Sequence, residues 1–133
     1  MKRLALIAVA GLLAAGPALA ADPVAGLWQT KPDDNGNFGY IQIAPCGTKI
    51  CGVLVKSFDK AGKPMKSDNI GKKIVWDMVD LGNGAYGDGK IWSPDRDKTY
   101  ASKMELTGDK LAVSGCILGG LICRSGGTWT RVK

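Results

Sequence analysis

The segment "TYASKMELTGDKLAVSGCILGGLICRSGGTWTRV" (residues 99–132) repeats one pattern along its length. Alternating apolar and polar residues form three runs, which Gly108-Asp109 and Gly119-Gly120 separate. Side chains two residues apart share one face of a strand, so this alternation predicts half-buried strands. Glycine-containing turns of this length join neighbouring strands as antiparallel hairpins.

The same pattern extends towards the N-terminus, where Asn35-Gly36 and Asn83-Gly84 are strong hairpin signals. The predicted strands are residues 26–31, 38–44, 49–57, 74–81, 85–93, 99–106, 110–118 and 121–132. Pairing the first strand with the last leaves no exposed sheet edge. We therefore predict an all-β fold, an eight-stranded antiparallel up-and-down β-barrel. A β-sandwich is the alternative, but it usually needs longer crossover connections.

Four cysteines form two local pairs, Cys46 with Cys51 and Cys116 with Cys123, and each pair flanks its own turn signal. This spacing predicts two local disulfides. A zinc site is the weaker alternative, because the chain has no histidine and neither spacing is usual for zinc. We expect no bound metal.

The palindrome "CILGGLIC" (116–123) predicts a stapled hairpin tip. A two-residue turn at Gly119-Gly120 pairs Leu118 with Leu121 and brings the two cysteines opposite each other. Because this register makes the cysteines a hydrogen-bonded pair, a wider turn or a bulge near Gly126-Gly127 is the alternative. We expect the barrel mouth or the 58–73 segment to cover the apolar tip; a partner or a membrane is the other candidate.

The N-terminus "MKRLALIAVAGLLAAGPALAADP" has a basic start, a short apolar run and small residues at 18–20. It predicts a signal peptide over residues 1–20 with cleavage before Ala21, and no transmembrane anchor. The remainder, 21–133, suits a single barrel domain. We expect a periplasmic or secreted protein.

One long connection, "FDKAGKPMKSDNIGKK" (58–73), is rich in lysine. We interpret it as a solvated surface loop. The alternative is a lid over one barrel end, with Phe58, Met65 and Ile70 folded inward.

Catalytic groups are sparse. Without histidine there is no Ser–His or Cys–His pair, and oxidised cysteines supply no thiolate. Clustered aspartates fit turns better than acid–base catalysis or calcium binding. The net charge of +6 comes without a concentrated basic-aromatic patch, so we expect no nucleic-acid partner. We predict no catalytic residues, no cofactor and no enzymatic activity.

Aromatic residues spread along the strands raise the question of ligand binding. Alternate side chains of a barrel strand point inward, so Tyr40, Trp76, Tyr86 and Trp92 are our candidates for ligand contacts. The alternative is that these side chains simply fill the core.

Four motifs in order are "GLW" (26–28), "IAPCGTKICGVLV" (43–55), "IWSPDRDKTY" (91–100) and "GTWTR" (127–131). Together they resemble the bacterial exported family catalogued as domain of unknown function 2147, over essentially the whole mature chain. That family typically has glycine where Asp97 stands. The resemblance implies a small barrel similar to lipocalins and fatty-acid-binding proteins, and it supplies no activity.

The "GLW" motif is also similar to the G-x-W that begins the first lipocalin strand. That likeness implies that Trp28 closes one barrel end and packs under Arg131 of the last strand. Trp129 shares a face with Arg131 and is the rival partner for it.

These observations favour an exported, non-enzymatic barrel that binds a small apolar or amphipathic ligand. The alternative is an envelope protein-interaction module that acts through an exposed surface loop.

Overall fold

A computed structural model of the chain describes residues 22–133. The expected signal peptide and its cleavage site before Ala21 lie outside the described residues. No helix in the described part of the chain is long and apolar enough to cross a membrane.

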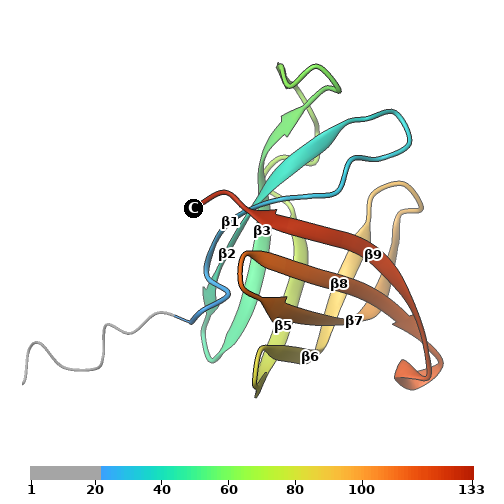
Figure 1. The fold of residues 1–133 in the computed structure, drawn as a ribbon. Helices are drawn as coiled ribbons and strands as arrows, with labels where there is room; N and C mark the ends of the chain where they lie inside the picture. Colours follow the sequence, from blue (N-terminus) through green and yellow to red (C-terminus); the bar gives the residue numbers. More distant parts are fainter. Residues whose placement is uncertain (1–21) are drawn as a thin grey trace, which may run out of the picture.

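Eight antiparallel strands form a closed ring in which each strand pairs with the next (Figure 1). They are β1 (Gly26–Gln29), β2 (Phe38–Cys46), β3 (Lys49–Phe58), β5 (Lys73–Gly82), β6 (Ala85–Ser93), β7 (Lys98–Thr107), β8 (Lys110–Ile117) and β9 (Ile122–Arg131). The ring closes where β1 pairs with β9, through Trp28 opposite Arg131 and Gln29 opposite Thr130. The predicted up-and-down barrel is confirmed, and the predicted strands differ from these mainly at their ends.

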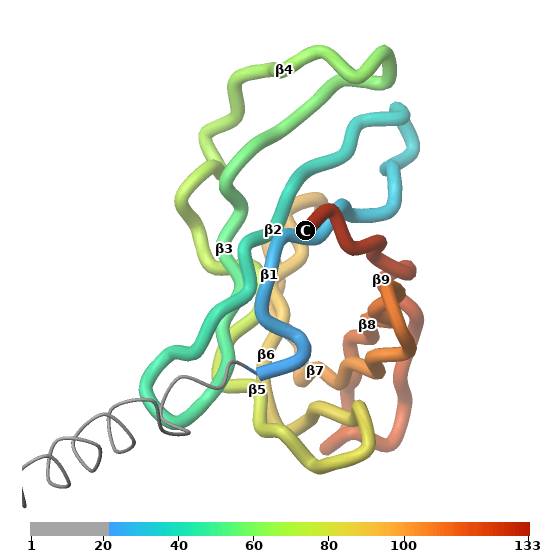
Figure 2. Tube along the Cα trace, turned by 60° about the vertical axis from the view of Figure 1, so that its left-hand side comes forward, coloured from blue at the N-terminus to red at the C-terminus, as the bar shows by residue number. Residues whose placement is uncertain are grey.

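The long connection between β3 and β5 is more ordered than a plain loop. It contains a two-residue strand, β4 (Pro64–Met65), which pairs with the end of β3. The Asp59 carboxylate accepts hydrogen bonds from the backbone N–H groups of Ala61 and Lys63, which fixes the turn. In both ribbon views this hairpin projects beside the β1–β2 loop (Figures 1 and 2). A Cβ on Gly36 would lie 2.6 Å from the Lys60 Cβ, so the two loops touch.

Both predicted disulfides, Cys46–Cys51 and Cys116–Cys123, are present. At the β8–β9 tip the expected pairing of Cys116 with Cys123 is confirmed. The expected two-residue turn is wrong: Leu118–Gly120 form one turn of 3-10 helix, η2, and the Leu121 N–H donates to the Leu118 carbonyl. This wider turn makes the cysteines a non-hydrogen-bonded pair, with Cα atoms 4.0 Å apart.

The apolar tip is not covered in the way we expected. Leu118 is 65% exposed and Leu121 is 85% exposed, so no part of the chain from 22 to 133 shields them. The reason is the wider turn, which holds both leucines beyond the last strand pair. Ile117 and Ile122, one step nearer the barrel, are about half exposed.

Apolar side chains pack one half of the barrel interior. On β8, Leu111 and Val113 point inward and are fully buried, and Trp129 on β9 lies opposite Leu111. Trp28, Ile43, Met78 and Met104 belong to the same core. Ile41, Leu54 and Ile74 of this core also border the cavity described below.

Candidate ligand-binding site

One end of the barrel is sealed around Trp28. Its indole is completely buried, and its Nε1 donates a hydrogen bond of 2.9 Å to the Val24 carbonyl oxygen. The Arg131 guanidinium carbon lies 4.4 Å from the centroid of the Trp28 ring. Trp129, the rival partner for Arg131, is buried in the core instead.

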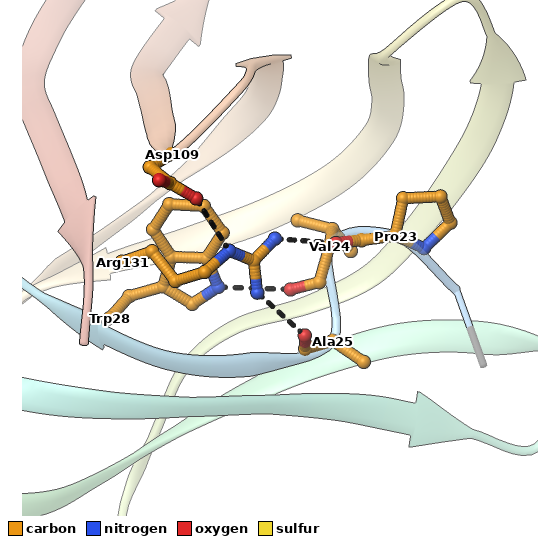
Figure 3. Close-up of polar contacts among 6 residues, drawn as sticks. All are labelled: Pro23, Val24, Ala25, Trp28, Asp109 and Arg131. Carbon is orange, nitrogen blue, oxygen red and sulfur yellow. Dashed lines mark hydrogen bonds and ion pairs between the residues drawn. The ribbon is translucent and has the colours of Figure 1, made fainter. Parts of the chain in front are cut away.

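Arg131 also holds the residues that precede β1 (Figure 3). It donates to the Pro23 carbonyl at 2.7 Å and to the Ala25 carbonyl at 3.0 Å. Its Nε lies 3.4 Å from a carboxylate oxygen of Asp109, an exposed side chain. These contacts tie the last ring strand to the segment that enters the first.

Tyr86 on β6 fixes the same segment from the opposite side of the ring. Its hydroxyl donates to the Asp22 carboxylate at 2.5 Å, and the ring is buried. Burial, followed by the hydrogen bond to Asp22, raises the pKa of the Tyr86 phenol well above its ordinary value. Residues 22–25 therefore lie across this barrel end, as Figure 2 shows in blue.

The opposite barrel end is hollow. A cavity of about 1090 Å³ opens there, and every ring strand except β1 contributes to its lining. Its floor consists of the buried side chains of Ile41, Leu54, Ile74 and Trp129. Further up, apolar and aromatic side chains form the wall: Phe38, Phe58, Met65, Ile91, Trp92, Tyr100, Ile117 and Ile122. The rim carries charges of both signs: Lys31, Asp33, Asp34, Asp95, Arg96, Lys98 and Arg124.

Trp92 is the one predicted ligand contact that lines this cavity. Its Nε1 donates to the Asp97 carboxylate at 3.0 Å, and the Lys72 ammonium lies 5.2 Å from the ring centroid. Asp97 has φ of 49°, a left-handed conformation that glycine and aspartate tolerate best. Aspartate thus keeps a turn suited to glycine and adds a hydrogen bond to Trp92.

The other three candidates do not line the cavity. Tyr86 lies at the sealed end. Tyr40 alternates with the buried Ile41 on β2, so it points away from the cavity, and it packs against Phe58 with ring centroids 4.6 Å apart. Trp76 is half-buried on β5 and pairs with Lys90 outside the cavity lining. We therefore carry the ligand-contact prediction forward for Trp92 alone.

Sequence reasoning missed Phe38 of the cavity wall and named Phe58 and Met65 only as inward residues of the alternative lid, whose third residue, Ile70, does not line the cavity. Phe38 and Phe58 face each other at the paired ends of β2 and β3, and their rings stack with centroids 5.1 Å apart. The signal available in the sequence was their position, since each stands at the strand end next to an open loop.

A second hollow of about 680 Å³ lies on the outer barrel surface. Its lining includes Lys103, Glu105, Ala112 and Thr128, which point away from the interior. We do not treat it as a ligand site, because Lys103, Glu105 and Thr128 are exposed on the outer face of the barrel and the hollow does not open into the barrel interior. Within residues 22–133, no group of three or more histidine, cysteine, aspartate or glutamate side chains lies close enough to hold a metal ion.

The profile of a bacterial family described as "Uncharacterized protein conserved in bacteria (DUF2147)" matches residues 26–131. The chain belongs to this family. The match covers the whole ring, from the first residue of β1 to the last residue of β9. The comparison with curated proteins found no match.

A solved structure similar to this family member is that of protein HP1028 from Helicobacter pylori, described as belonging to the lipocalin family. The two chains superpose with a TM-score of 0.67 at 16% sequence identity, over 86% of this chain and 85% of that chain. At this identity the similarity shows the fold alone, a lipocalin-like barrel.

Proposed function

We propose that this protein is an exported, non-enzymatic barrel that binds one small apolar or amphipathic molecule in its open end. The observation that carries the proposal is the cavity of about 1090 Å³ with a buried apolar floor. Ligand sites are typically hollows of about 300–1,000 Å³ with mainly apolar walls and a few polar groups. The sealed end at Trp28 leaves the opposite mouth as the entrance.

Export is part of the proposal. Both cysteine pairs are oxidised, and disulfides of this kind persist in oxidising compartments such as the periplasm. The expected signal peptide over residues 1–20 would deliver the chain there.

Native mass spectrometry of protein purified without denaturation from a bacterial periplasm tests the proposal. We expect a stoichiometric adduct with the mass of a small organic molecule. A ligand-free mass, together with no response to a panel of fatty acids, alcohols and lipids, would contradict it.

Tryptophan fluorescence, recorded while the same panel of ligands is added, locates the binding site. Trp92 and Trp129 line the cavity, whereas Trp76 does not. We expect Trp92→Phe to reduce the fluorescence change on ligand addition and Trp76→Phe to leave it intact. If Trp76→Phe abolishes the change instead, the ligand binds elsewhere.

A second function, an envelope protein-interaction module, is favoured by one specific observation. Leu118 and Leu121 stand exposed on a disulfide-stapled tip, which is unusual for apolar side chains without a partner. A pull-down from envelope extracts with wild type and with Leu118→Asp/Leu121→Asp tests it. Recovery of the same proteins by both would exclude the tip as the interface.

A further inference from the structure

Arg124 is an exposed residue of strand β9 that lines the mouth of the cavity. On β9 it pairs with Gly115 of β8. The pair formed by Ile117 and Ile122 lies two residues nearer the tip, and all four residues line the cavity. An arginine at such a position places a permanent positive charge against an apolar wall. The other charged groups of the rim lie in loops or at the start of a strand.

The Arg124 guanidinium has no partner among residues 22–133. The ion pair found in this part of the chain joins Arg131 to Asp109, and no side-chain hydrogen bond involves Arg124. Arg131, by contrast, is fully engaged at the sealed end. Arg131 therefore has a structural role. The contacts within residues 22–133 give no such role to Arg124.

Among residues 22–133, no acidic side chain of the cavity rim forms an ion pair with Arg124. Asp33 accepts hydrogen bonds from the backbone N–H groups of Asn35 and Asn37, and Asp97 accepts from Trp92. Asp34 and Asp95, also on the rim, lie exposed in loops. Neither pairs with the guanidinium, so its donors remain available.

Gly115 is the neighbour of Arg124 on the adjacent strand β8. A Cβ added to Gly115 would lie 3.4 Å from the nearest heavy atom, the Cβ of Tyr100, which is an ordinary contact. Packing therefore does not require glycine at this position. A longer side chain there would fill cavity space beside Tyr100 and Ile91, so the glycine leaves that space free on the strand next to Arg124.

We propose that Arg124 binds the anionic head group of an amphipathic ligand whose apolar part lies on the cavity floor. The inference rests on the proposed function and adds the chemical class of the ligand. The planar guanidinium matches the two oxygens of a carboxylate or a phosphate ester with parallel hydrogen bonds. Ile41, Leu54 and Ile74 would take the hydrocarbon chain.

Titrations with four probes of equal chain length test this inference: dodecanoate, dodecyl phosphate, dodecan-1-ol and dodecyltrimethylammonium. For the wild type we expect at least one anion to bind about tenfold more tightly than the alcohol, and the cation to bind more weakly than the alcohol. Comparing the two anions identifies which oxyanion the site prefers.

Arg124→Gln should reduce the preference for the anion to less than about twofold and leave the affinity for the alcohol unchanged. Lys103→Gln, on the outer face of β7, removes the same charge and should preserve the preference. Arg124→Lys keeps the charge but loses the planar guanidinium. Its preference for the anion over the alcohol should lie between those of the wild type and Arg124→Gln.

The outcomes separate the two proposals. If the alcohol binds the wild type as tightly as either anion, the barrel binds ligands but the role of Arg124 is overturned. An anion preference that survives Arg124→Gln overturns it as well. If none of the four probes binds, both the proposed function and this inference fail.

Discussion

Arg131 lies over Trp28, and this contact joins the last ring strand to the first. The guanidinium carbon is 4.4 Å from the indole centroid, and both residues belong to the short β1–β9 ladder. That ladder has two residue pairs, whereas the β8–β9 ladder has eight. Backbone hydrogen bonds between Leu27 and residues 132–133 extend the closure beyond this ladder, and the Arg131 side chain adds to it. Trp28 and Arg131 also seal this end of the barrel, which leaves the other end for a ligand.

Replacement of Arg131 by glutamine should destabilise the fold by about 2–4 kcal/mol, because it removes the stacking on Trp28 and two charged hydrogen bonds. Denaturant unfolding measures the change. Asp109→Asn is the matched control: its ion pair is exposed, so we expect less than about 0.5 kcal/mol. If both variants lose the same free energy of unfolding, the contacts of Arg131 with the Pro23 and Ala25 carbonyls and with Trp28 do not stabilise the fold as we expect.

Tyr86 should make stability fall at alkaline pH. Its pKa is raised in the folded state, so above about pH 10 the unfolded chain loses a proton that the native state keeps. The free energy of unfolding then decreases as pH rises, by up to about 1.4 kcal/mol per pH unit.

Tyr86→Phe removes this titration while preserving the buried ring. The difference in unfolding free energy between wild type and variant should be constant from pH 7 to 9 and shrink above pH 10. A difference that stays constant up to pH 11 would show that the phenol titrates normally.

Gly89 should tolerate no side chain. A Cβ there would lie 2.2 Å from the Met78 sulfur and 2.6 Å from the Trp76 carbonyl oxygen. We expect Gly89→Ala to cost about 2–4 kcal/mol or to prevent folding, because backbone must move. Gly126→Ala, where the nearest atom is 3.4 Å away, should cost less than about 1 kcal/mol. Thermal unfolding of both variants checks the contrast.

Loss of the Cys116–Cys123 disulfide should weaken the barrel without abolishing it. The bond closes a small loop, with a sequence separation of 7, so the double alanine variant should lose about 2–3 kcal/mol. Amide hydrogen exchange should accelerate mainly at the tip, residues 117–122. Uniformly faster exchange throughout the ring would instead show that the staple supports the whole fold.

The strand order was predictable because each turn carries a local signal. Asn35-Gly36, Asn83-Gly84 and the glycine pair at 119–120 mark hairpins, and because six of the seven connections are short, little choice of topology remains. The stacking of Arg131 on Trp28 followed from the G-x-W likeness. Turn width at the tip did not follow, because Gly119-Gly120 fits both a two-residue turn and the observed 3-10 turn.

The inward faces were harder to predict, because bulges change the alternation of side chains. Tyr40 points outward because it alternates with the buried Ile41, and the alternation itself did not show which face of β2 is inward. The β3–β5 register shifts near Asp77, which adopts φ of 55°. Aspartate tolerates this conformation, but an aspartate in a strand sequence does not by itself predict a bulge. Phe38 and Phe58 stand at the ends of β2 and β3, where alternation alone does not show whether a side chain still faces the cavity.

Methyl NMR of the isotope-labelled protein during titration with dodecanoate tests the central claim most directly. We predict one binding site, with the largest shift changes at Leu54, Ile74 and Ile91 and small changes at Val24 near the sealed end. Changes confined to Leu118 and Leu121, or none at saturating probe, would contradict a ligand site inside the open end of the barrel.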